Sequence, residues 1–141
     1  MFNLKSSYKI LKEYNLLIEV HSGTIDFESY VNFKKKVISD SEFSPNLNFL
    51  INFTNAFFTI TNEEIEYLVD FISKNSKLNN KRYTALVTDT PNQLVSSTLF
   101  KILQNNPLRP VEIFSTNECA LEWLNCNDLP IDKILNELNN S

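Results

Sequence analysis

The sequence predicts an α/β fold, a mixed and mostly parallel sheet built from successive βα units in the order β-β-α-β-α-β-α-β-α. Short apolar runs alternate along the chain with longer segments whose apolar residues recur every three or four positions. The clearest strand-and-helix pairs cover 82–103 and 111–124. The 141 residues suit a single domain, 1–141, with a core over about 8–125 and an amphipathic C-terminal helix over about 130–139.

Composition narrows the classes of protein that the chain can belong to. It is 43% hydrophobic with 11 Phe, which suffices for a core without metals or disulfides, and its net charge of −4 argues against nucleic-acid binding. No apolar stretch approaches the ~20 residues of a membrane span, and the start of the chain lacks the apolar core of a signal peptide. Cys119 and Cys126 lack metal-ligand spacing and are expected to be free thiols. We therefore expect a bacterial-type cytoplasmic protein with no stable membrane insertion.

The first part of the chain predicts a hairpin followed by a helix. Strands are expected over 8–11 and 16–21, and the second is apolar enough to be buried on both faces. Gly23, the only glycine, is expected between the second strand and the helix, where a positive φ is often needed. The helix is expected over 26–39, with Lys34, Lys35 and Lys36 on its solvated face.

The remaining units are predicted from apolar runs, helix caps and apolar spacing. Strands are expected over 47–53, 83–87 and 111–114. The residues expected to cap the second, third and fourth helices are Thr61 (with Glu64 completing a capping box), Asp89 or Thr90, and Ser115 or Thr116. Each helix is also expected to turn one apolar face to the core. In the second helix this face is Ile65, Leu68, Val69 and Ile72, and in the third it is Val95, Leu99, Ile102 and Leu103. In the fourth it is Ala120, Leu121, Trp123 and Leu124, and in the tail helix it is Ile131, Ile134, Leu135 and Leu138.

The end of the core carries a short pattern of its own. A strand of the form Val-x-x-Phe is followed by a helix of the form Ala-x-x-Trp-Leu, at Val111, Phe114, Ala120, Trp123 and Leu124. Together with the element order, this pattern resembles the SpoIIAA-like group of the STAS superfamily. The resemblance implies a SpoIIAA-like fold and a non-enzymatic role in regulation or protein interaction.

The resemblance also implies a place to look for phosphorylation. Anti-sigma-factor antagonists of this group carry an Asp-Ser-Ser-Gly run at the start of the second helix. This chain reads NFTNAFFTITNEE over 52–64 and lacks that run. Thr61 is its nearest equivalent, with Thr54 and Thr59 as neighbours, and we expect Thr61 to be a helix cap before it is a switch.

Residues that usually carry chemistry are sparse in this chain. His21 is the only histidine and is expected to be structural, because no partner for it stands at a defined spacing. A single glycine excludes a glycine-rich phosphate loop. Asp89 is the best-placed carboxylate, and a helix cap explains it more simply than catalysis. We expect no catalytic residue, no cofactor and no metal site.

The segment 53–60 is the most unusual, because three phenylalanines and an isoleucine crowd what the pattern predicts to be a loop. Such a loop folds back over the core or presents an apolar surface to a partner or ligand. We expect a protein-interaction or regulatory module with an unknown partner, and as the alternative a small carrier of an apolar or lipid-like ligand. A homodimer is also expected. Its interface is either Phe57 and Phe58 or the tail stripe, which is the apolar face of the C-terminal helix formed by Ile131, Ile134, Leu135 and Leu138. The expected site residues are Thr54, Phe57, Phe58, Thr59, Ile60 and Thr61, with Asp89 and Thr90 as neighbours.

Overall fold

A computed structural model describes residues 3–140, which form one five-stranded sheet in the order β1-β2-β3-β4-β5. The strands are β1 (Lys5–Leu11), β2 (Leu16–Ile25), β3 (Asn48–Phe58), β4 (Thr84–Val87) and β5 (Val111–Phe114). β1 pairs antiparallel with β2, and every later pair is parallel. The predicted mixed, mostly parallel sheet is therefore confirmed.

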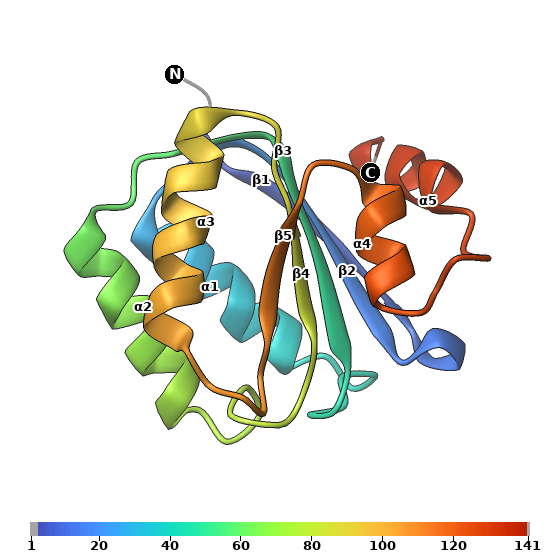
Figure 1. The fold of residues 1–141 in the computed structure, drawn as a ribbon, viewed down its shortest axis with the longest axis horizontal. Helices are drawn as coiled ribbons and strands as arrows, with labels where there is room; N and C mark the ends of the chain where they lie inside the picture. Colours follow the sequence, from blue (N-terminus) through green and yellow to red (C-terminus); the bar gives the residue numbers. More distant parts are fainter. Residues whose placement is uncertain (1–2, 141) are drawn as a thin grey trace.

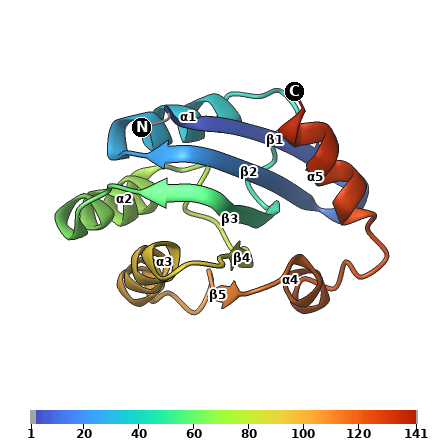
Figure 2. The ribbon, with the colours of Figure 1, turned by 90° about the horizontal axis from the view of Figure 1, so that it is seen from above.

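Helices cover both faces of the sheet (Figure 1). One face carries α1 (Phe27–Ile38), α2 (Asn62–Lys74) and α3 (Pro91–Gln104), and the other carries α4 (Asn117–Trp123) and α5 (Ile131–Asn139). Figure 2 shows the same division from above, with the strands running side by side in chain order. A short 3-10 turn, η1 (Lys12–Tyr14), joins β1 to β2 and ends at Asn15 in the left-handed region with φ 52°.

Threonine side chains start three of the helices as the sequence predicts. Thr61 and Thr90 each accept a hydrogen bond from the third residue of their helix, and Glu64 and Gln93 complete the two capping boxes. Thr116 caps α4 in the same way. Each cap satisfies an N–H group that has no partner inside its helix. Of the two candidates for the cap of α3, Asp89 and Thr90, the structure shows Thr90.

The side chains of the central strands alternate between the two faces of the sheet and build one hydrophobic core on each face. Leu17 and Ile51 point toward α1, α2 and α3, whereas Leu16, Ile18 and Leu50 point toward α4 and α5. Because consecutive side chains of a strand point to opposite faces, β2 and β3 supply both cores at once. Glu19 and His21 are in phase with Leu17 and therefore lie on the side of α1.

Three strands extend further than the sequence predicts, and β1 starts at Lys5 instead of Tyr8. β2 continues to Ile25, so Gly23 lies inside a strand, with φ 83°. β3 continues to Phe58, so residues 54–58, predicted as a loop, are strand. Pairing with a neighbouring strand overrides a local sequence that lacks clear alternation.

A β-bulge explains the irregular pattern in β3. Two residues, Phe53 and Thr54, lie opposite the single residue His21, and the pairing register shifts there by one. One extra residue inverts the faces to which later side chains point. Phe58 consequently joins the core under α2 and α3, and Phe57 is 56% exposed.

Three further side chains differ from their predicted exposure. Lys34 is only 3% exposed, not solvated, because its ammonium group pairs with a buried carboxylate. Val95 and Ile102 point outward from α3, at 66% and 63% exposure. Trp123, in contrast, packs against the core beside Leu121 and Leu124 as the sequence predicts, with its ring edge-on to Tyr83.

The tail helix packs on its own sheet. Ile131 and Ile134 of α5 are buried against a core that includes Leu11 and Ile18, and Leu135 and Leu138 pack against the same core. Among residues 3–140, no helix has the length and apolar character needed to cross a membrane.

Candidate functional site

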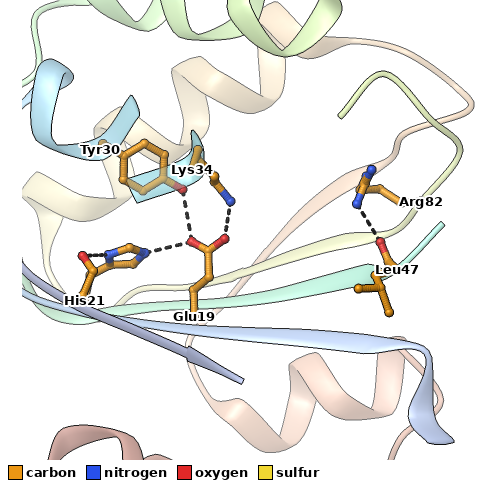
Figure 3. Close-up of polar contacts among 7 residues, drawn as sticks. Glu19, His21, Tyr30, Lys34, Leu47 and Arg82 are labelled. Atoms are coloured by element: carbon orange, nitrogen blue, oxygen red, sulfur yellow. Dashed lines mark hydrogen bonds and ion pairs between the residues drawn. The ribbon is translucent and has the colours of Figure 1, made fainter. Parts of the chain in front are cut away.

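A buried polar cluster lies between β2 and α1 (Figure 3). The Glu19 carboxylate accepts hydrogen bonds from Lys34 Nζ, from His21 Nε2 at 2.9 Å and, more weakly, from the Tyr30 hydroxyl at 3.4 Å. The second ring nitrogen of His21, Nδ1, lies 2.7 Å from Ser6 Oγ. Every partner comes from β1, β2 or α1, so the cluster connects the antiparallel edge of the sheet to its first helix.

The charges in this cluster follow from burial and pairing. Burial by itself would raise the pKa of Glu19, but Lys34 and His21 lower that pKa to about 2, so the group is a carboxylate. Burial lowers the pKa of His21, against the pull of Glu19, and favours the neutral ring. A carboxylate only accepts, so Nε2 carries the ring proton and the Ser6 hydroxyl donates to Nδ1. The histidine ring is therefore fully buried, with both nitrogens held by partners inside the fold.

A cavity of about 70 Å³ lies beside this cluster, between the sheet and the helices α1, α2 and α3. Its wall is mostly apolar, and α2 and α3 cover it with side chains that are only partly buried, such as Ile72 and Phe100. The aromatic and aliphatic residues that line it include Phe49, Ile51, Phe53, Phe58, Ile60, Ile65, Leu68, Ile72 and Phe100.

Three cations also line this cavity: Lys34, Arg82 and Arg109, all largely buried. Lys34 Nζ and the Arg82 guanidinium carbon lie 4.6 Å and 4.2 Å from the centre of the Phe49 ring. Figure 3 shows Arg82 turned to the Leu47 carbonyl, away from Glu19. The cavity therefore has an apolar body and a cationic margin.

Unpartnered polar atoms gather in the same wall. Within the described residues, the buried side-chain atoms without a hydrogen-bond partner are Ser97 Oγ, Gln104 Oε1 and Arg109 Nε. All three residues line the cavity. Buried polar groups in folded proteins are almost always paired, so their concentration here marks the cavity as the place where the fold leaves hydrogen bonds unused.

The structure divides the predicted interaction segment between two places. Phe58 and Ile60 line the cavity, whereas Thr54, Phe57 and Thr90 border a shallow hollow on the outside. The start of α3 is fastened to the end of β3 there, because Asn92 exchanges two hydrogen bonds with the Phe58 backbone. The remaining members, Thr59, Thr61 and Asp89, are exposed and border neither place.

The residues that sequence reasoning missed are the buried cations. Lys34 was assigned to solvent with its neighbours, and Arg82 and Arg109 stand next to loops, where basic residues are common. The available signal was the helical spacing of Lys34 from Tyr30 and Val37, which places it on the apolar face. In the described part of the chain, no group of three or more His, Cys, Asp or Glu side chains could hold a metal ion.

Comparison with known proteins identifies the architecture. The chain is similar to the crystal structure of an uncharacterized protein of the DUF3478 family from Shewanella loihica PV-4, described as having a SpoIIAA-like fold. The TM-score is 0.55 with 14% sequence identity, over 86% of this chain and 93% of that one.

The fold is SpoIIAA-like. This confirms the architecture that the pattern over 111–124 and the element order predict. No protein-family model matches the chain, and no curated protein is significantly similar to it. At this level of sequence identity, similarity to a solved structure shows the arrangement of the elements only. The function has to be argued from the site itself.

Proposed function

We propose that this protein is a non-enzymatic, SpoIIAA-like module that binds a compact apolar ligand between its sheet and the helices α2 and α3. The observation that carries the proposal is the cavity of about 70 Å³, with its apolar wall and its unpartnered polar atoms. Binding sites for small molecules usually combine an apolar wall with a few convergent polar groups. The only histidine supports a non-enzymatic role, because its ring is 0% exposed and a substrate does not reach it.

The volume of the cavity limits the size of the ligand. A water molecule needs about 10–15 Å³ of such space, so the cavity accommodates roughly five to seven non-hydrogen atoms. A long lipid chain would require α2 and α3 to separate. These helices have fewer fully buried residues than α1, which makes them the moveable side of the cavity.

The test is a titration of the labelled protein with toluene, a neutral apolar probe, followed by the chemical shifts of backbone amides. We expect saturable shifts in β3, α2 and α3. Ser97→Leu, which fills the cavity, should abolish them, whereas Thr98→Leu on the exposed side of α3 should not. Shifts that are absent in the wild type, or that persist in Ser97→Leu, would contradict the proposal.

A second candidate function is self-association through Phe57, and the exposure of that ring favours it. The tail stripe, the other surface expected to form a homodimer, is largely covered by the sheet of its own chain. Phe57 is 56% exposed on a strand and borders a hollow with Gly23 and Thr90. A rigid exposed aromatic side chain suits an interface between two copies.

Light scattering at high micromolar concentration tests this candidate. A dimer that dissociates in Phe57→Ser and persists in Leu108→Ser, an equally exposed apolar residue in a loop, would support it. A wild-type chain that stays monomeric would exclude it.

A further inference from the structure

Two buried arginines at the margin of the cavity lack an anionic partner. Arg82 and Arg109 are 4% and 6% exposed, and within residues 3–140 neither forms an ion pair. Arg82 donates only to backbone carbonyls, those of Pro45, Leu47 and Lys77. Arg109 donates to the side-chain oxygen of Asn79. Buried charges in proteins are normally paired, because an isolated charge loses its hydration without compensation.

The surroundings of the two arginines do not compensate their positive charge. The Glu19 carboxylate, whose charge acts on Arg82 from a distance, is already paired with Lys34. Burial, together with the nearby Arg109 cation, lowers the pKa of Arg82 to about 10. A negative charge between or beside the two guanidinium groups would relieve both effects.

Hydrogen-bonding capacity is free at the same place. Arg109 Nε has no partner, and it lies in the wall that also holds the unpartnered Ser97 hydroxyl and the Gln104 amide. A guanidinium and a hydroxyl both donate to oxygen, and an amide presents either a donor or an acceptor. These groups come from α3 and from the loop that follows it, so they converge on the cavity from one side.

We propose that the ligand of this cavity is a compact apolar carboxylate, whose carboxylate group binds Arg109 beside Arg82 while its apolar body fills the space under α2 and α3. This inference rests on the proposed function. A planar carboxylate matches the fork of a guanidinium, and its single charge costs less to bury than the higher charge of a phosphate. The volume limits the apolar body to a short or branched chain.

The experiment compares two probes of equal size, pentanoate and pentanamide, by titration of backbone amide shifts at pH 7.5. We expect pentanoate to bind about ten-fold tighter or more, the usual effect of a hydrogen bond to a charged group. Arg109→Gln should remove that advantage and leave the affinity for pentanamide unchanged, which also shows that the variant is folded. Arg109→Lys, which keeps the charge and loses the fork, should retain part of the advantage.

The other outcomes separate this inference from the function on which it rests. Equal binding of the two probes would overturn the carboxylate and leave the apolar-ligand function intact. Binding of neither probe would overturn both. Inorganic phosphate that binds as tightly as pentanoate would overturn the inference as well, because the apolar body would then contribute nothing.

Discussion

At the scale of single residues, the burial of Glu19 makes the fold depend on the partners of its carboxylate. Its carboxylate is inaccessible to water and is balanced by Lys34, with His21 and Tyr30 as further donors. Removing one member of a buried ion pair is far more damaging than replacing both, because the remaining charge is left without compensation.

The first prediction concerns this ion pair. Lys34→Met should lower the free energy of unfolding by about 3–5 kcal/mol, measured by urea denaturation. Lys35→Met, its exposed neighbour, should change it by less than about 0.5 kcal/mol. The double variant Glu19→Gln/Lys34→Met should recover part of the loss. Equal effects of the two lysine variants would show that Lys34 is not buried as described.

The second prediction concerns pH. The folded-state pKa of His21 lies below its usual 6.5, so the unfolded chain binds a proton there that the folded chain does not. Stability is therefore full above about pH 6.5 and falls as the pH is lowered below it. Glu19, with its pKa of about 2 in place of 4.5, adds a further loss only below about pH 4.5.

Urea midpoints at pH 7.5 and 5.5 measure the histidine effect. The wild type should lose stability between these values, and His21→Gln, which keeps a donor toward Glu19 and does not titrate, should lose less. A pH dependence that is the same in both proteins would assign the loss to other groups.

At the scale of elements, helix starts are predictable from the sequence and the end of β3 is not. Thr61 and Thr90 act on residues within one turn, so the capping signal is complete in the local sequence. The bulge at Phe53 and Thr54 depends on pairing with β2, more than 30 residues earlier in the chain. The cationic margin was missed for the same reason, since Arg82 and Arg109 meet Lys34 only through the topology.

The third prediction concerns those caps. Thr61→Ala and Thr90→Ala should each lower the free energy of unfolding by about 1 kcal/mol, because each leaves a helix N–H group without its partner. Thr98→Ala, on the exposed face of α3, should have no such cost. Thermal or urea denaturation of the three variants measures these effects. A Thr61→Ala chain as stable as the wild type would show that the Thr61 cap does not stabilise the fold.

At the scale of the whole molecule, the tail helix is part of the core. Ile131 and Ile134 of α5 cover the outer face of β1 and β2, where Leu11, Leu16 and Ile18 lie. A helix as short as α5 is marginal in water, so this packing is what keeps it formed.

The fourth prediction follows from that packing. A chain that ends at Asn127 loses the buried side chains of Leu129, Ile131 and Ile134. At about 1.5–3 kcal/mol for each, its free energy of unfolding should fall by roughly 5–9 kcal/mol. A control chain that ends at Asn139 should match the full length. A truncated chain with undiminished stability would mean that α5 contributes nothing to the core.

The order of the strands has a consequence for how the molecule assembles. Each strand lies beside its predecessor in the chain, so no later strand has to insert between two earlier ones. Such a sheet can grow from one edge as the polypeptide emerges from the ribosome, and pairing of near neighbours favours rapid folding. β5, with Arg109 just before it in the chain, is the last strand to join, at the opposite edge. The cavity thus gains Arg109, whose Nε has no partner, only after the other residues that line it have been synthesised.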